Sequence, residues 1–367
     1  MKIPGPGRTA RRQAESRLHA SAFTILELLV AMTVMVILFG LLAGILSNTT
    51  RVLGQAQGSG EATRAAQTGF DTLRRSLAQA TLNSYWGYDD PGSPANYLRL
   101  SELNFVSGAG AELTALPGVR THAVFFQAPL GFADPGAPIS GSSGNATSLL
   151  NSLNATGYFV RFGDDPTKRP NVLGAASNPR FRFRLMQFLE PTTSLSVYKS
   201  TDSDPPATRL KWFRDSLDAD KYVSVLAENV VALIILPKPA GQNPPDPFSL
   251  VKVVNNESWN PTGAYNYDSR EGGISAATRH FLPPSIRVIA VSIDEPSATK
   301  LQGDSTTMPF DLDALGLFRT GASEALLRSD LSRLEDILTA KPGNVAGNKI
   351  ACTYRIFETD IPLADSK

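Results

Sequence analysis

The side chains of this sequence that could bind a cation are aspartates that occur in pairs. These pairs are Asp164-Asp165, Asp202/Asp204 and Asp311/Asp313. Calcium prefers carboxylate oxygens of this kind, although no EF-hand spacing accompanies the pairs. Paired aspartates in loops also form turns, and turn formation is the simpler interpretation of all three pairs.

Residues for enzyme chemistry are scarce. The histidines are His19, His122 and His280, and the sequence contains no Gly-x-Ser-x-Gly motif, phosphate-binding loop or Cys-x-x-Cys pair. His122 lies in an apolar run, which predicts a hydrogen-bonded core residue rather than a ligand. Cys352 is the single cysteine, and its apolar surroundings predict a packing role. We therefore expect no enzyme activity, no metal site and no cofactor.

The composition narrows the function classes further. The chain has 367 residues, with 35 Lys+Arg against 34 Asp+Glu and a formal net charge of +1, so there is no reason to expect a nucleic-acid partner. Hydrophobic residues make up 42% and charged residues 19%, which excludes a strongly disordered chain and a polytopic membrane protein. The length allows one large domain or two small ones.

One carboxylate lies at the start of a long apolar segment. A basic leader, residues 1–22, precedes this segment with a net charge of 5 − 1 = +4. Glu27 is the only charged residue between the leader and Arg51, and the apolar part, Leu28–Leu46, has 46 − 28 + 1 = 19 residues. These residues cover about 28 Å as a helix, enough to cross the hydrocarbon core of a bilayer. A carboxylate in hydrocarbon costs about 2.5–3.5 kcal/mol, so Glu27 requires a partner or a purpose.

Three kinds of targeting segment can be weighed against these residues. A cleaved secretory signal requires a shorter run and a small-x-small cleavage site, which Leu46-Ser47-Asn48 does not provide. Twin-arginine export is suggested by Arg11-Arg12, but the usual apolar residues do not follow that pair. An unprocessed signal anchor explains the length and the basic flank, which predicts a cytoplasmic amino terminus, but it leaves Glu27 unexplained.

A motif at the start of the apolar segment resembles the class III signal of type IV prepilins and type II secretion pseudopilins. It reads Ala22-Phe23-Thr24-Ile25-Leu26-Glu27-Leu28-Leu29-Val30. The resemblance implies that a prepilin peptidase/methyltransferase cleaves between Ala22 and Phe23 and methylates the new amino terminus. It also implies that Glu27 pairs with the Phe23 amine of a neighbouring subunit, which compensates for its burial. The family usually has glycine before the cut, where this chain has Ala22.

Together with this resemblance, the pattern along the chain predicts an α+β, pilin-like protein. It has a long amino-terminal membrane-spanning helix followed by a β-rich globular head. We assign residues 1–22 to the leader, 23–46 to the transmembrane helix, 47–82 to its amphipathic continuation and 83–367 to the head. Phe70, Leu73 and Leu77 form the apolar face of the continuation. Long loops are predicted at 131–157 and 237–247.

Within the head, apolar or alternating runs bounded by turn residues predict strands. They lie at 97–105, 122–129, 158–162, 181–189, 285–293 and 350–357. Residues 323–340 predict a helix with a leucine-rich stripe. Phe181-Arg182-Phe183-Arg184-Leu185 alternates most clearly, and the expected structure is a half-buried strand with a solvated basic face. Asn145-Ala-Thr147 and Asn154-Ala-Thr156 match a glycosylation pattern short enough to arise by chance.

Three head segments most closely resemble the Verru_Chthon cassette protein C family, whose members carry prepilin-type leaders and have no established activity. They are IRVIAVSIDE at 286–295, the helix at 323–340 and YRIFETDIPL at 354–363. The sequence LPPSIRV at 282–288 also resembles the late strand of J-type minor pseudopilins.

The resemblances imply a structural subunit that assembles with other pilin-like subunits into a pilus, a pseudopilus or another envelope complex. Its implied place is the lipid bilayer of the inner (cytoplasmic) membrane, crossed once, with the amino terminus cytoplasmic and the head periplasmic. The residues leave open an unprocessed, signal-anchored binding module that does not polymerise and needs neither Glu27 nor cleavage at Ala22. An anchored hydrolase is disfavoured because a nucleophile motif is missing and histidines are few.

Overall fold

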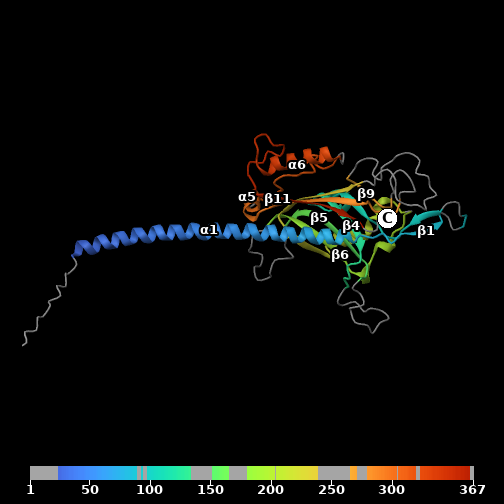
Figure 1. The fold of residues 1–367 in the computed structure, drawn as a ribbon, viewed down its shortest axis with the longest axis horizontal. Helices are drawn as coiled ribbons and strands as arrows, with labels where there is room; N and C mark the ends of the chain where they lie inside the picture. The colour runs from blue at the N-terminus through green and yellow to red at the C-terminus, as the bar shows by residue number, and fades with distance from the viewer. Residues whose placement is uncertain are drawn as a thin grey trace, which may run out of the picture. The chain divides into compact units, whose positions relative to one another are not determined.

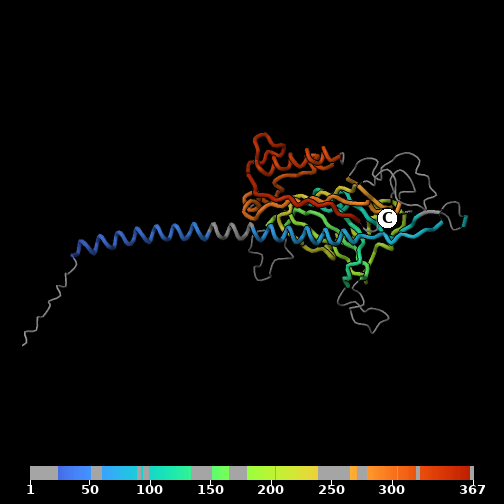
Figure 2. The backbone as a smooth tube through the Cα atoms, in the orientation of Figure 1, coloured from blue at the N-terminus to red at the C-terminus, as the bar shows by residue number. Residues whose placement is uncertain are grey.

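The computed structural model describes residues 24–88, 92–93, 97–133, 151–164, 180–202, 204–238, 265–270, 279–303, 305–319 and 323–363. They form an amino-terminal helix followed by a β-sheet-rich region, an α+β architecture (Figures 1 and 2). The chain divides into two compact units, Met1–Gly54 and Gln55–Lys367. The division falls inside the first helix, and we call Gln55–Lys367 the globular unit.

The larger sheet of the globular unit has six antiparallel strands in the order β7-β6-β5-β4-β3-β9. The strands are β3 (Val106–Ala109), β4 (Val119–Ala128), β5 (Asn154–Gly163), β6 (Arg182–Glu190), β7 (Val223–Glu228) and β9 (Tyr267–Asp268). Nearly every side chain of β4, β5 and β6 is buried, so both faces of the sheet centre are covered.

Two smaller sheets and several short helices complete the globular unit. One sheet has the order β11-β10-β8, with β8 (Val230–Lys238), β10 (Ser285–Ile293) and β11 (Tyr354–Pro362); the other pairs β1 (Tyr85–Tyr88) with β2 (Tyr97–Leu100). The helices are α2 (Gly110–Thr114), α3 (Pro206–Arg209), α4 (Lys211–Asp218), α5 (Glu295–Gln302) and α6 (Glu324–Leu338), with 3-10 turns η3 (Thr192–Ser194) and η4 (Val197–Lys199).

A β-bulge in β4 joins the two larger sheets. The register of β4 with β5 shifts at Thr121, whose φ is 58°. There the Thr121 hydroxyl accepts a hydrogen bond from the Leu233 N–H at 3.1 Å, and His122 Nδ1 accepts one from the Ile235 N–H at 2.9 Å. Leu233 and Ile235 belong to β8, the edge strand of the three-stranded sheet. The bulge therefore closes an edge whose N–H groups would otherwise lack partners.

The first helix, α1, runs from Ile25 to Ala78, four residues short of the predicted end at 82. In the globular unit its predicted apolar face, Phe70, Leu73 and Leu77, is buried, which confirms the spacing argument. A Cβ added at Gly69 would lie 3.3 Å from Ala227 Cβ on β7. This part of α1 therefore packs tightly on the larger sheet, with glycine at the closest approach.

Several predicted elements are confirmed. Strand β10 has the predicted bounds 285–293, and the runs predicted at 122–129, 158–162 and 181–189 fall on β4, β5 and β6. The predicted helix at 323–340 is α6, and its cap is Ser323, whose Oγ accepts a hydrogen bond from the Leu326 N–H at 3.3 Å.

Other strand predictions need correction. The run predicted at 97–105 breaks after Leu100, and β3 begins at Val106. The last strand begins at Tyr354 instead of residue 350, so Cys352 precedes it. Strands β1, β3, β7, β8 and β9 were not predicted. Strand β8 is a continuous apolar run that is buried on both faces, and the sequence criteria applied to the other runs would also have identified it.

The two predicted loops also overlap strands. Strand β5 begins at Asn154, inside the predicted loop 131–157, and β8 extends to Lys238, inside the loop 237–247. Small polar residues fit a strand here because Asn154 is buried and its Nδ2 donates to the carbonyls of Phe132 and Glu190. These bonds also make Asn154 inaccessible as a glycosylation acceptor. Residues 134–150 and 239–250 lie outside the described residues.

Candidate functional site

The amino-terminal part of α1 begins with a side-chain cap. The Thr24 hydroxyl accepts a hydrogen bond from the Glu27 N–H at 3.2 Å, and the Leu28 N–H donates to the Thr24 carbonyl at 3.2 Å. Thr24 is therefore the N-cap and Glu27 the third helical residue, the positions of a Thr-x-x-Glu capping box. The predictions from the sequence missed the cap at Thr24, although the two residue types and their spacing signal it.

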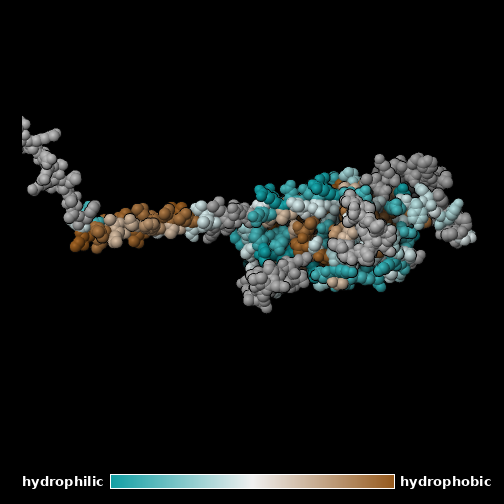
Figure 3. Space-filling view, turned by 90° about the horizontal axis from the view of Figure 1, so that it is seen from below, coloured by the Kyte–Doolittle hydropathy of each residue, from teal (hydrophilic) through white to brown (hydrophobic). Residues whose placement is uncertain are grey.

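The residues that follow the cap form an apolar surface on all sides. Within the described residues, one helical stretch, Ile25–Thr50, is long and apolar enough to cross a membrane. It has 26 residues, and its most apolar window of 18 residues has a mean hydropathy of 2.7 and no buried residue. Figure 3 shows this stretch as hydrophobic surface.

The threonine hydroxyl groups in this stretch are satisfied inside the helix. Thr33 Oγ1 donates to the Val30 carbonyl at 2.8 Å, and Thr49 Oγ1 donates to the Ile45 carbonyl at 2.8 Å. Such bonds to the preceding turn remove polar groups that hydrocarbon cannot solvate. The Glu27 carboxylate differs from these hydroxyl groups. It is exposed and has no ion-pair partner among the residues the structure describes.

The predicted processing residues cannot be placed beside Glu27. Ala22 and Phe23 lie outside the described residues, so cleavage and methylation there stay predictions. Glu27 itself lies in the first turn of α1. A carboxylate in a first turn is favoured by the helix dipole, which complements the cap.

The aspartate pairs are engaged by protein groups. Asp311 binds Arg120 Nε at 3.0 Å, and Asp313 accepts a hydrogen bond from the Thr121 N–H at 3.1 Å, so this pair supports the β4 bulge. Asp202 Oδ2 lies 2.8 Å from His280 Nε2, and Asp204 accepts from the Thr201 N–H at 2.7 Å.

The remaining pair is described in part. Asp164 accepts from the Arg180 N–H at 3.1 Å, and Asp165 is not among the described residues. Within the residues that are described, no three histidine, cysteine or acidic side chains gather as a metal site would require.

The arginines of β6 do not form the predicted solvated face. Arg182 and Arg184 are only 7% and 4% exposed. Arg182 Nη2 lies 3.4 Å from Glu295 on α5, and Arg184 Nε donates to Glu228 on β7 at 3.2 Å. A buried guanidinium requires such partners, and segments remote in the sequence supply them.

His122 and Cys352 have packing roles, as predicted. The Nε2 of His122 lies 2.8 Å from the Phe318 carbonyl, so the neutral ring donates there and accepts at Nδ1. Burial lowers the pKa of His122 to about 4. Burial raises the pKa of the Cys352 thiol to about 11, so little thiolate exists near neutral pH.

Comparison with known proteins does not assign the chain to a family. It matches no protein-family model, and no significant match was found among curated proteins or solved structures. The function must therefore be argued from the residues and their geometry.

Proposed function

We propose that this chain is a prepilin-like, pseudopilin-type subunit with a pilin-like fold. It would anchor in the bilayer through α1 and assemble with other pilin-like subunits into a pilus, pseudopilus or envelope complex. The observation that carries the proposal is the stretch Ile25–Thr50, apolar on every side, with a single carboxylate in its first turn. The leader and the motif Ala22–Val30 support the same function.

The mechanism is electrostatic and not catalytic. A prepilin peptidase/methyltransferase would cut after Ala22 on the cytoplasmic side and leave a methylated Phe23 amine. In the bilayer an isolated Glu27 is unfavourable, by about 2.5–3.5 kcal/mol on insertion scales. The Phe23 amine of a neighbouring subunit would neutralise that carboxylate, so the charge favours assembly over the separate subunits.

A second candidate is a signal-anchored binding module that remains monomeric. The bond from the Glu27 backbone N–H to the Thr24 hydroxyl places Glu27 at the third position of a Thr-x-x-Glu pattern. A glutamate there caps the helix when its side chain accepts from the Thr24 N–H, a role that needs no neighbour. The two candidates differ in whether the negative charge itself is required. Capping by Glu27 needs only an acceptor at this position, which glutamine also provides.

Three substitutions separate charge from capping. Glu27→Gln removes the charge but keeps the acceptor, Thr24→Ala removes the cap but keeps the carboxylate, and Glu27→Val removes both. We expect both Glu27 variants to insert into the membrane normally. At equal abundance of variant and wild type in native membranes, the yield of crosslinked or co-purified pilin-like partners should fall at least tenfold. Thr24→Ala should retain partner recovery, with a loss of about 0.5–2 kcal/mol in helix stability.

Two results would contradict this proposal. Equal partner recovery from Glu27→Gln and wild type would contradict the assembly function and favour the monomeric binding module. Equal loss from Thr24→Ala and Glu27→Gln would show that the helix start matters and the charge does not. Intact mass of the native protein provides a separate check. We expect a chain without residues 1–22 that carries one added methyl group, and a chain beginning at Met1 would exclude processing.

A further inference from the structure

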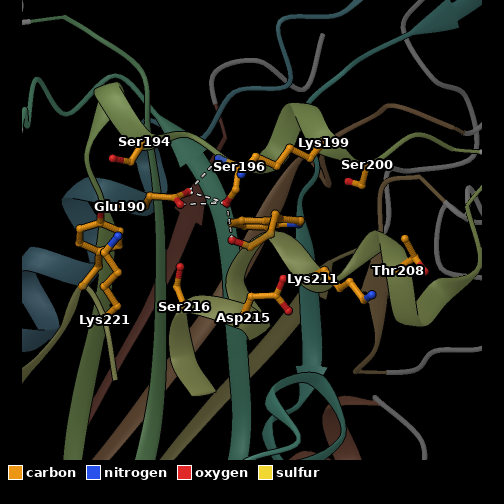
Figure 4. Close-up of a pocket in the computed structure, with 12 residues that line it drawn as sticks. Glu190, Ser194, Ser196, Lys199, Ser200, Thr208, Lys211, Asp215, Ser216 and Lys221 are labelled. Carbon is orange, nitrogen blue, oxygen red and sulfur yellow. Dashed lines mark hydrogen bonds between the residues drawn. The ribbon is translucent and has the colours of Figure 1, made fainter. Parts of the chain in front are cut away.

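The connection between β6 and β7, residues 191–222, lines an open cavity of about 570 Å³ together with Glu190 (Figure 4). Its walls come from η3, η4, α3, α4 and the segment before β7. A tight hairpin turn needs only a few residues, so this long connection forms a separate cap on the sheet. The volume is typical of small-molecule sites and far exceeds the about 30 Å³ that a water molecule occupies.

The cavity has a fixed framework. The Phe213 ring of α4 stacks on Phe125 of β4 with centroids 3.9 Å apart and planes at 7°, which fixes α4 on the sheet. Ser196 Oγ lies 2.8 Å from Glu190 Oε1 and 2.8 Å from the Trp212 carbonyl, so it ties β6 to α4. Figure 4 shows these bonds at the centre of the cavity wall. Such a preformed wall lowers the entropy cost of binding a ligand.

One buried donor in the wall has no partner. Trp212 lines the cavity and is 2% exposed, and its Nε1–H makes no hydrogen bond within the described residues. Indole can only donate, and a buried donor left without an acceptor costs about 1–3 kcal/mol. The Nε1 atom itself is shielded from solvent, so Trp212 contributes its apolar ring to the wall rather than a donor to a ligand.

The charged groups at the cavity are mainly cationic. Lys199, Lys211 and Lys221 line it from three different segments, and Asp215 contributes one exposed carboxylate (Figure 4). The second acid, Glu190, is buried and already accepts hydrogen bonds from Ser196. Burial raises the pKa of Glu190, and the nearby Lys199 and Lys221 act in the opposite direction. The surplus of ammonium groups favours an anionic ligand.

The hydroxyl groups identify the rest of the ligand. Ser194, Thr208 and Ser216 line the same cavity, so donors and acceptors stand beside the lysines and Asp215. No arginine, the usual bidentate partner of phosphate, is among the described lining residues. We propose that this cavity binds an acidic oligosaccharide, with a uronate carboxylate on the lysines and sugar hydroxyls on Asp215 and the serine and threonine side chains. This ligand site goes beyond the assembly proposed above and does not depend on it.

Calorimetry with the full-length protein in detergent tests the proposal. Trigalacturonate is the probe, and maltotriose and inorganic phosphate are the comparison ligands. We expect trigalacturonate to bind, and the double variant Lys199→Gln/Lys211→Gln to weaken binding at least tenfold, since both lysines are exposed and their replacement spares the core. Lys349→Gln, which changes an exposed lysine away from the cavity, should bind as wild type does.

Trp212→Phe is a second control. It keeps an aromatic ring in the wall and removes only the solvent-shielded N–H, so we expect it to bind as wild type does. The lysine variant tests the proposal even if Trp212→Phe does not fold. Absence of trigalacturonate binding, or the same loss in Lys349→Gln, would overturn the proposal. Equal affinity for maltotriose would exclude the acidic requirement, and phosphate binding of equal strength and lysine dependence would indicate a simple anion site.

Discussion

The two ends of α1 share one helical geometry but have opposite surroundings. In Ile25–Thr50 the apolar side chains point in all directions and are exposed. In the globular unit the apolar residues of α1 form one stripe, which is buried, while Arg64, Arg74 and Arg75 are exposed on the other faces. A stripe is covered by one neighbour, whereas a helix that is apolar all round needs a surrounding medium.

This contrast separates two kinds of hydrophobic stabilisation. The stripe around Leu73 stabilises the globular unit itself, because the sheet buries it on folding. The described residues leave Ile25–Thr50 uncovered, so its apolar area is available to a bilayer or to another apolar surface. Substitutions in the two parts of α1 should therefore affect different measurements.

The largest difference is expected from a pair of leucines. Leu73 is 0% exposed and Leu42 is 51% exposed. Leu73→Ala should lower the free energy of unfolding of the globular unit by about 2–5 kcal/mol, because it leaves a cavity under α1. Leu42→Ala should leave that free energy unchanged. Urea unfolding followed by tryptophan fluorescence measures both, and equal losses would contradict the division of α1.

Acid should lower the stability of the globular unit and leave the helicity of Ile25–Thr50 unchanged. Burial lowers the pKa of His122 to about 4, while an unfolded histidine has a pKa near 6.5. The neutral native ring thus contributes stability above pH 6.5, and this contribution is lost as the pH falls from 6.5 to 4. The full difference corresponds to about 3 kcal/mol. The measurement is the free energy of unfolding against pH.

The matched control for this pH dependence is His122→Gln. It should be less stable at neutral pH and should lack the His122 part of the decline between pH 6.5 and 4. If the free energy of unfolding depends on pH in the same way for the wild type and the variant, His122 does not cause the acid destabilisation. Helicity of Ile25–Thr50 in detergent should not follow the same curve, since that stretch holds one titratable side chain, Glu27.

A pair of glycines gives the smallest expected difference. Gly157 faces Phe125 across the β4–β5 pair, and a Cβ there would overlap the ring. Gly157→Ala should destabilise the globular unit by about 1–3 kcal/mol through overpacking. Gly44 has no atom within 4 Å of such a Cβ, so Gly44→Ala should not lower that stability. Thermal unfolding of both variants compares them, and a large loss in Gly44→Ala would mean that the globular unit depends on this stretch.

Local patterns predicted a substantial part of the fold. The bounds of β10, the helix α6 and the buried stripe of α1 follow from periodicity and turn residues, which act within a few residues. The cap at Thr24 was equally readable and was missed. The Arg182 and Arg184 face was predicted wrongly for a different reason. Alternation shows that two faces differ but not which segments cover them.

The sequence by itself determined the apolar stretch, the position of its single carboxylate and the strands β4, β5, β6 and β10, because these depend on side chains close together along the chain. Tertiary structure decided the rest. Glu295 reaches Arg182 across 113 positions, and Asp313 reaches the Thr121 backbone across 192. The cavity of residues 191–222 likewise exists only because α4 packs on Phe125. Burial depends on which distant surfaces meet, and a local pattern does not contain that information.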